Sequence, residues 1–204
     1  MSKIAIIGAT GRAGSQLLEE ARRRGHSVTA IARKASTLGH RDGVTTRDVD
    51  VHDGFALQQV LVGHDVVLSA AHFSGIPAAL IIEPAKTAGV KRLLVVGGAG
   101  SLLLPSGQRV IDSPDFPPEY KAEAGAGAVF LDALRQEKEL DWTFLSPSAL
   151  FFEGERTGKF RLGKDQLLMD GDGKSAISFA DFAIAMLDEV EKPSHSRQRF
   201  TVGY

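Results

Sequence analysis

The sequence contains no cysteine, which excludes disulfide bonds, thiolate metal sites and cysteine nucleophiles. It also has no excess of charge of either sign, because 24 lysines and arginines stand against 25 aspartates and glutamates, for a formal net charge of −1. A chain so close to neutrality has no general attraction for nucleic acid or for an anionic membrane surface. Any binding must come from a local site, and we expect no nucleic-acid partner.

Long hydrophobic runs are missing as well. The longest nearly apolar stretch, residues 93–104, is interrupted by glycine and serine and falls well short of the roughly twenty residues that a membrane span needs. At the beginning of the chain, Ser2 and Lys3 precede an apolar segment that is too short for a secretory signal. We therefore expect no membrane partner and a cytoplasmic location.

Two kinds of catalytic signature are also absent. The Gly-x-Ser-x-Gly motif that would support a hydrolase does not occur, and no group of residues has the spacing of metal ligands. Asp112, Asp115 and Glu119 look like a carboxylate cluster, but they lie in a proline-rich segment. We interpret this segment as a loop that covers a site rather than as a metal centre.

The hydrophobic residues that are present follow two alternating patterns. Residues 4–7 form a continuous apolar run, as in a parallel strand that is covered on both faces. From residue 12 to residue 24 the spacing becomes helical, with Leu17 on the apolar face and Glu20 on the polar face. The patterns predict further strands at residues 27–32, 44–49, 65–70, 92–96, 142–145 and 199–202, and further helices at 53–61, at 76–88, within 119–139 and at 179–191 after a Ser178 cap.

This order of strands and helices predicts the fold class. Alternation of the βαβα kind implies a parallel sheet with right-handed crossovers. A chain of 204 residues, 43% of them hydrophobic, can form one substantial core. We therefore predict an α/β protein with a single Rossmann-like domain over residues 1–204 and a doubly wound, mostly parallel sheet. Substrate loops should follow strands four to six, at residues 71–76, 97–120 and 146–175.

The loop between the first strand and the first helix is rich in glycine. In this position Gly8 permits a tight turn, Gly11 lets a pyrophosphate approach the backbone, and Gly14 lets the helix pack closely on the strand. The free N–H groups at the start of the helix can then hold phosphates. Glycines can also serve a turn alone, but their place inside a βαβ unit favours dinucleotide binding.

The end of the second strand indicates which dinucleotide is bound. An NAD site usually has an acidic residue there for the ribose hydroxyls, whereas this chain has Ala32, Arg33 and Lys34. Arg33, with help from Arg12 and Lys34, could bind a 2′-phosphate through charge-assisted hydrogen bonds. The alternative is that these residues are ordinary solvated cations. We predict NADP(H) as the cofactor.

Four segments together resemble a known family. They are the glycine loop at residues 8–14, the strand end at 30–33, the sequence LVVGGAGS at 94–101 and the tail RQRFTVGY at 197–204. They are similar to the atypical short-chain dehydrogenase/reductase group of NAD(P)H-binding proteins, in particular its NADH-flavin reductase branch, which is related to flavin/biliverdin reductase B. The resemblance covers essentially the whole chain.

The resemblance implies roles for particular positions. The segment from Thr10 to Gly14 would hold the pyrophosphate, Arg33 the adenosine phosphate, and the pair after the third strand the adenine edge. The residues beyond the fourth strand would pass under the nicotinamide ribose, and those after the sixth would face the carboxamide. The full set of expected cofactor-binding residues is Gly8, Thr10, Gly11, Arg12, Ala13, Gly14, Arg33, Lys34, Asp48, Val49, Ala70, Ala71, His72, Gly97, Gly98, Pro147 and Ser148.

One departure from the family pattern affects the expected chemistry. Typical short-chain dehydrogenases use a Tyr-x-x-x-Lys pair. The only tyrosines in this chain are Tyr120 and Tyr204, and the position four residues after Tyr120 is Ala124 rather than lysine. Acid–base chemistry on alcohols and ketones is therefore disfavoured. Hydride transfer to a flavin or quinone-like acceptor remains reasonable, because such rings delocalise the added charge and take their proton from water. FMN or FAD would then be a substrate rather than a bound cofactor.

Three residues are candidates for the substrate side of the site. Ser101 follows the fifth strand and could donate a hydrogen bond to the acceptor, although it could also simply close a loop. His72 could relay a proton, and Tyr120 could join Phe73 and residues 151–152 in an aromatic floor. For the histidine and the phenylalanines, a structural role is the more common one.

Two other functions remain open at this point. The chain could be a redox sensor or regulatory module that binds NADP without turnover, which the missing Tyr–Lys pair also fits. It could instead be an isomerase or epimerase of nucleotide sugars, although little chain remains outside the sheet to bind a sugar. We expect a monomer or a homodimer with a small-molecule substrate.

Overall fold

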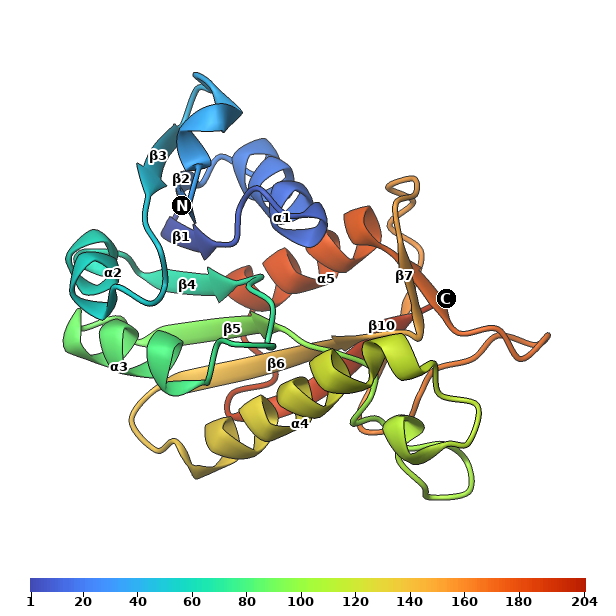
Figure 1. Ribbon diagram of the computed structural model, residues 1–204. Coiled ribbons are helices and arrows are strands. Elements are labelled where there is room, and N and C mark those ends of the chain that lie inside the picture. Colours follow the sequence, from blue (N-terminus) through green and yellow to red (C-terminus); the bar gives the residue numbers. More distant parts are fainter.

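The first strand, β1 (Lys3–Ile7), is buried on both sides, as its unbroken apolar run predicts. Because successive side chains of a strand point to opposite faces, Ile4 and Ile6 belong to one hydrophobic cluster and Ala5 and Ile7 to another. The computed structural model describes residues 1–204 and shows the sheet between two layers of helices (Figure 1). The predicted α/β fold with a doubly wound sheet is therefore confirmed.

Eight strands form the main sheet. In chain order they are β1, β2 (Ser27–Ala32), β3 (Val44–Asp48), β4 (Val66–Ser69), β5 (Arg92–Val96), β6 (Asp141–Pro147), β8 (Arg161–Gly163) and β10 (Gln198–Gly203). Their order across the sheet is β3-β2-β1-β4-β5-β6-β10-β8, and only β8, at one edge, is antiparallel to its neighbour. The order reverses between β1 and β4, and open α/β sheets bind their ligands at the carboxyl ends of the strands beside such a point.

Five α-helices cover the sheet. They are α1 (Arg12–Arg23), α2 (Gly54–Leu61), α3 (Ala79–Thr87), α4 (Lys121–Gln136) and α5 (Phe179–Glu191). Helices α1 and α5 pack side by side on one face, and α2, α3 and α4 lie on the other (Figure 1). Three short 3-10 helices, at Ala35–Leu38, Val110–Asp112 and Pro118–Tyr120, occur in the connections.

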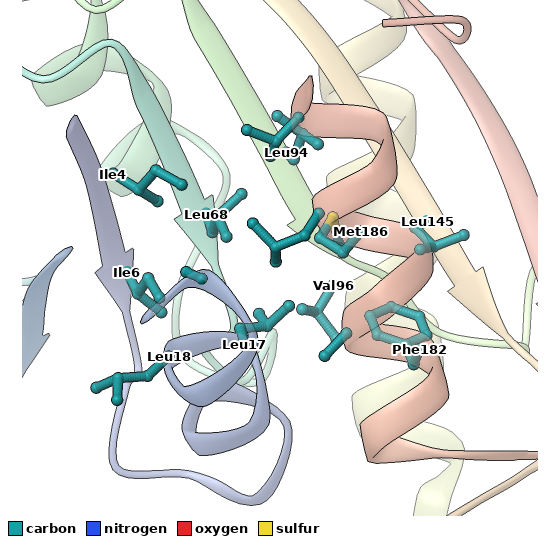
Figure 2. Close-up of a cluster of buried hydrophobic side chains, with 14 of the residues drawn as sticks. Ile4, Ile6, Leu17, Leu18, Leu68, Leu94, Val96, Leu145, Phe182 and Met186 are labelled. Carbon is teal, nitrogen blue, oxygen red and sulfur yellow. The ribbon is translucent and has the colours of Figure 1, made fainter. Parts of the chain in front are cut away.

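The core under α1 and α5 follows the helical spacing of the sequence. Leu17 and Leu18 of α1 belong to the same buried cluster as Phe182 and Met186 of α5 (Figure 2). Ser178 caps α5 as predicted, because its side chain accepts a hydrogen bond from the N–H of Asp181. The prediction for Glu20 of α1 is wrong, because the helical spacing placed this residue on the polar face and the structure buries it.

The largest departures from the predicted elements follow β6. This strand is longer than predicted because it pairs with β5 over residues 141–145 and with β10 over residues 143–147. Strand β8, and the strands β7 (Leu150–Phe152) and β9 (Ala176–Ser178) of a separate small sheet, were not predicted. Each of the three has only three residues, which is too short to display a period of two.

Helix α3 differs from prediction near the site, whereas α4 lies within its predicted range. Helix α3 begins at Ala79 rather than residue 76, because a turn that bonds the Ile76 N–H to the Phe73 carbonyl comes first. Within α4, residue 127 is a glycine because a Cβ there would lie only 2.9 Å from the Phe73 ring. The glycine therefore lets α4 pack against the loop that follows β4.

None of the helices combines the length and the apolar composition that a membrane crossing requires.

Candidate functional site

The glycine loop between β1 and α1 has a shape that only glycine permits at two positions. Gly8 adopts a φ of +79°, and a Cβ there would lie 2.7 Å from the Ala70 carbonyl oxygen after β4. A Cβ on Gly14 would lie 2.1 Å from the Gly8 carbonyl oxygen. Side chains are therefore barred where the loop touches the neighbouring strand end and where α1 closes on the loop.

Four backbone N–H groups of this loop have no acceptor within the protein. They belong to Thr10, Arg12, Ala13 and Gly14, whereas the Gly11 N–H is used by the turn itself, 3.0 Å from the Gly8 carbonyl. The start of α1 has no side-chain cap and no acidic residue in its first turn. Unpaired N–H groups at the positive end of a helix dipole favour a bound anion. The loop therefore fits the pyrophosphate of a dinucleotide.

The strand end beside this loop carries unneutralised positive charge. The side chains of Arg33 and Lys34 are exposed and form no ion pair or hydrogen bond within the protein. The guanidinium of Arg12 lies over the ring of Phe179, 5.5 Å from its centroid, and is therefore held against the start of α5. Arg33 and Lys34 are thus free to meet a phosphate at the end of β2.

The carboxylate of Asp48, the residue expected at the adenine edge, is hydrogen-bonded within the protein. Its two carboxylate oxygens accept hydrogen bonds from the hydroxyl and the backbone N–H of Ser36, each at 2.7 Å. These bonds, the hydroxyl first, hold the pKa of Asp48 below its ordinary value. Val49 follows with its N–H bonded to the Ala32 carbonyl at 3.0 Å. These contacts fix the backbone at the ends of β2 and β3.

The loop after β4 carries Ala70, Ala71 and His72 past the glycine loop. The His72 side chain is 88% exposed, with Nδ1 3.5 Å from a carboxylate oxygen of Glu123 on α4. Glu123 also accepts the backbone N–H groups of Phe73, at 2.7 Å, and Ser74, at 2.8 Å. Burial alone would raise the pKa of Glu123, but these N–H donors outweigh it, so that its pKa lies below the ordinary value. The ionised carboxylate fixes the position of this loop.

Sequence analysis missed Glu123, and no local signal could have revealed it. Its partners lie 49 and 50 positions earlier in the chain. Only the packing of α4 against the β4 loop brings them together.

The loop after β5 forms the wall of a cavity of about 460 Å³, which we call the acceptor cavity. Gly97 must be glycine because a Cβ would lie 2.3 Å from the Phe144 ring, whereas Gly98 faces open space. Most of the lining comes from this loop and from α4. The lining residues are Phe73, Gly97, Gly98, Ala99, Gly100, Ser101, Leu104, Val110, Ser113, Asp115, Phe116, Pro117, Tyr120, Glu123, Ala124, Gly127, Ala128 and Ala149.

The structure brings two of the three candidate catalytic residues to the acceptor cavity. Ser101 and Tyr120 line it, and His72 does not. Asp115 lines the wall in the proline-rich segment that was interpreted as a cover. Asp112 pairs instead with Arg109, 2.7 Å away, and no group of carboxylates and histidines could hold a metal ion.

The expected aromatic floor is only partly present. Phe73 lines the cavity, but its ring also packs against Phe130 and Phe144 in the core, at centroid distances of 5.2 and 6.0 Å. Phe151 does not line the cavity, because it packs on Phe179 and Phe182 of α5. The expectation that phenylalanines of this fold are mostly core residues therefore applies to these rings.

The residues after β6 lie close to the sheet. The side chain of Ser148 is turned inward: it is 1% exposed, and its hydroxyl donates to the Val202 carbonyl at 3.1 Å. Pro147 is the last residue of β6 and is also buried. Both residues are buried, so neither exposes its side chain to a bound nicotinamide carboxamide.

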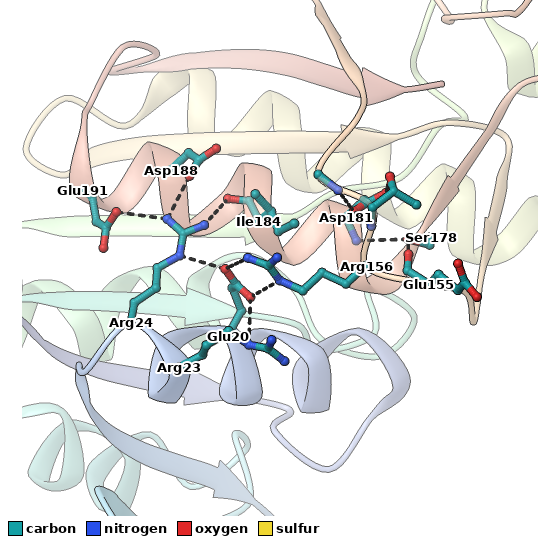
Figure 3. A network of polar contacts seen from close by, with 12 residues as sticks. Glu20, Arg23, Arg24, Glu155, Arg156, Ser178, Asp181, Ile184, Asp188 and Glu191 are labelled. Atoms are coloured by element: carbon teal, nitrogen blue, oxygen red, sulfur yellow. Dashed lines mark hydrogen bonds and ion pairs between the residues drawn. The ribbon is translucent and has the colours of Figure 1, made fainter.

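An ionic network holds the segment after β7 against the helices of the other face (Figure 3). Arg156 donates to both carboxylate oxygens of the buried Glu20, at 2.8 and 2.9 Å, and Arg24 joins them at 2.9 Å. The bond from Arg156 is the largest cause that lowers the pKa of Glu20, against the effect of burial. Asp181, at the start of α5, accepts the N–H groups of Thr157 and Gly158, each at 2.8 Å. This segment is anchored to α1 and α5.

The fold and the glycine loop define a dinucleotide-binding protein of the oxidoreductase type. The chain belongs to the NAD(P)H-binding family, whose model matches residues 8–190. The match runs from the first glycine of the loop almost to the end of α5. It confirms the family resemblance and the nicotinamide dinucleotide as the cofactor class, without distinguishing the two coenzymes.

Proteins of known sequence or structure are similar over nearly the whole chain. "Uncharacterized protein YwnB" of Bacillus subtilis is 43% identical, over 98% of this chain and 97% of that protein. A solved structure from Streptococcus pneumoniae, described as a "putative NADH-flavin reductase", is 37% identical with a TM-score of 0.84, over 100% of this chain and 99% of that one. A structure from Bacteroides thetaiotaomicron, described as a "putative epimerase", is 42% identical with a TM-score of 0.94, over 100% and 97%.

The cytoplasmic location stays a prediction. A solved structure from Burkholderia pseudomallei, 42% identical with a TM-score of 0.91 over the full length of both chains, is described as a "putative exported protein".

Proposed function

We propose that this protein is an NADPH-dependent reductase of a planar, conjugated acceptor such as a flavin or a quinone. The observation that carries the proposal is the acceptor cavity, which opens at the same end of the sheet as the glycine loop and is lined mainly by apolar residues and glycines. Such a cavity suits a flat ring system, and its only tyrosine, Tyr120, has Ala124 in place of a partner lysine. The chemistry that fits is hydride transfer without a protein acid–base pair.

In this proposal, different residues bind the cofactor and the acceptor. The unpaired N–H groups of Thr10, Arg12, Ala13 and Gly14 bind the pyrophosphate, and the bound nicotinamide supplies the hydride. The β4 loop from Ala70 to His72, fixed by Glu123, supports the nicotinamide side. Ser101 donates a hydrogen bond to the acceptor, and Tyr120 covers it. Orientation and exclusion of water are the main contributions of the protein.

The proposal is tested by measuring NADPH oxidation by the purified protein at 340 nm with FMN, FAD, a quinone or biliverdin added in turn. We expect turnover with at least one of these acceptors. Nucleotide binding by calorimetry without oxidation for any acceptor would contradict a reductase and favour the redox sensor or regulatory module.

The name of the Bacteroides thetaiotaomicron relative raises the epimerase alternative. A nucleotide sugar would bring many hydroxyl groups into the acceptor cavity, where the apolar residues and glycines leave them few partners. Burial of unpaired hydroxyls is costly, so this cavity favours an aromatic acceptor over a sugar.

The preference for NADPH rests on Arg33 and has its own test. The substitution Arg33→Ala should weaken NADPH binding by about 1 to 3 kcal/mol and leave NADH nearly unchanged, because only NADPH has a 2′-phosphate to lose its charge-assisted hydrogen bonds. Calorimetric titration with both nucleotides measures the difference. Arg135→Ala, which removes an exposed arginine from α4, is the matched control and should change neither affinity. Equal losses for both nucleotides in Arg33→Ala would contradict the assignment.

A further inference from the structure

A buried arginine lies directly behind Ser101. Arg199 is on β10, and its register opposite Phe144 places it on the face of the sheet that α4 covers. Its side chain is 4% exposed. One nitrogen, Nη1, donates to the Ser101 hydroxyl oxygen at 3.3 Å and to the buried Ser146 hydroxyl oxygen at 3.5 Å. The guanidinium thus reaches from the sheet to a residue that lines the acceptor cavity.

The remaining donors of Arg199 bind Asp165. Nε and Nη2 both donate to the same carboxylate oxygen, at 2.8 and 2.6 Å. Asp165 is half-exposed, and its backbone carbonyl accepts the Leu103 N–H at 2.8 Å. The Leu167 N–H in turn donates to the Leu103 carbonyl at 2.9 Å. The segment after β8 therefore pairs with the loop that carries Ser101, and the positions of Arg199 and Ser101 are fixed together.

The direction of the hydrogen bond from Arg199 determines what Ser101 can do. Because an arginine can only donate, the Ser101 oxygen is the acceptor, and its own proton is free to point elsewhere. No protein acceptor takes that proton, and Ser101 lines the cavity. A hydroxyl that accepts from a cation is a stronger donor, since neighbouring hydrogen bonds polarise one another.

We propose that Arg199 is a positioning residue that acts through Ser101: it orients the Ser101 hydroxyl into the cavity and stabilises negative charge on the atom that the hydroxyl contacts. The inference rests on the proposed function and narrows the acceptor class. The acceptor should carry, beside its reacting centre, an oxygen or nitrogen that gains negative charge on reduction, as the carbonyl of a quinone or the ring of a flavin does.

The charges of the step balance in the following way. NADPH loses a hydride, which is two electrons with one proton, and becomes NADP⁺. The neutral acceptor gains the hydride and becomes an anion, whose charge is spread over the conjugated ring and the atom that faces Ser101. Water supplies the proton that later neutralises this anion. Ser101 keeps its own proton throughout, so Arg199 and Ser101 supply electrostatic stabilisation only.

The kinetic test compares five variants with the wild type in the NADPH oxidation assay. Arg199→Met should lower kcat by about 10- to 100-fold with little change in KM, less than the loss of a direct donor because Arg199 acts through Ser101. Arg199→Lys should recover much of that loss, and Ser101→Ala combined with Arg199→Met should cost little more than Ser101→Ala alone. Arg161→Met, which removes another arginine beside β10, is the control and should keep the wild-type kcat.

The substitution Asp165→Asn tests whether the negative charge of Asp165 matters apart from its role in holding Arg199 in place. Asparagine keeps an oxygen for Arg199 but removes the negative charge, so the proposal expects a kcat equal to or above that of the wild type. If the ion pair served only to hold the fold, Asp165→Asn and Arg199→Met would lose activity together. That result, or the absence of rescue by Arg199→Lys, would overturn the inference.

A binding experiment keeps this inference separate from the proposed function. Calorimetry on the NADP⁺-saturated protein compares 2-hydroxy-1,4-naphthoquinone, which is an anion at pH 7, with neutral 1,4-naphthoquinone. We expect the wild type to bind the anion about 10-fold more tightly and Arg199→Met to lose the preference, a difference of about 1.4 kcal/mol. This preference without turnover would refute the proposed function alone. Turnover without any effect of Arg199→Met would refute the inference alone, and absence of both would refute both.

Discussion

Nucleotide binding should be weakened about 100-fold by the single substitution Gly14→Ala. The added Cβ would lie 2.1 Å from the Gly8 carbonyl oxygen and 2.8 Å from the Gly8 carbonyl carbon. Both are backbone atoms, so they cannot rotate away as a side chain could. The loop must open, which moves the Arg12 and Ala13 N–H groups away from the phosphates. With about 1.5 kcal/mol lost for each hydrogen bond to a charged group, two such losses weaken binding about 100-fold. Calorimetry with NADPH and NADH should show the loss for both.

The same clash should also destabilise the fold, by about 1 to 3 kcal/mol as for other overpacked sites. Gly125→Ala in α4 is the matched control, since its Cβ would meet only Ile111 Cδ1 at an ordinary 3.8 Å. It should leave nucleotide binding unchanged and stabilise the protein by up to about 1 kcal/mol, because alanine favours a helix more than glycine does. If Gly14→Ala bound nucleotide as the wild type does, the loop would not be the pyrophosphate site.

The largest loss of stability is expected from Glu189→Ala. The Glu189 side chain is 3% exposed and accepts hydrogen bonds from Arg92 Nη2 at 2.8 Å and from the His195 ring at 2.8 Å. It also accepts the backbone N–H groups of Ser194 and His195, at 3.0 and 2.9 Å. Its removal leaves Arg92 buried and charged, with these N–H groups unpaired. We expect a loss of about 3 to 5 kcal/mol in the free energy of unfolding, measured by urea denaturation.

Asp132→Ala provides the comparison for this prediction. Asp132 also pairs with an arginine, Arg135, at 2.8 Å, but its side chain is 66% exposed. An exposed pair of this kind contributes only about 0.5 kcal/mol, because water screens the charges and solvates either partner alone. Similar losses for Asp132→Ala and Glu189→Ala would show that burial does not control the strength of these ion pairs.

Sequence patterns predicted the helices and strands best where the pattern was long or capped. The bounds of β2, β5 and α5 agree with prediction, since their apolar runs end at turns or, for α5, begin at the Ser178 cap. The start of α4 was uncertain because two glycines weaken its helical pattern. The structure supplies the reason for one of them: Gly127 lets the Phe73 ring approach.

The sequence predicted some of the residues around the candidate site and missed others. The glycine loop and the exposed cations at the end of β2 could be located from the sequence because their positions depend on one strand and one helix. Glu123 and Arg199 could not, because each acts on a residue about 50 or 100 positions away. The inward turn of the Ser148 hydroxyl was also invisible to the sequence, since it depends on β10 lying beside β6.

The sequence by itself determined the Rossmann-like order of strands and helices, the glycine loop and the positive charge at the end of β2. These features are local, because hydrophobic periodicity, helix caps and glycine turns act over a few neighbouring residues. Only the tertiary structure decided that α4 and the β5 loop form an acceptor cavity, that Glu20 is buried, and that Arg199 stands behind Ser101. These features depend on which distant segments pack together, and single-sequence patterns do not encode the partner of a side chain.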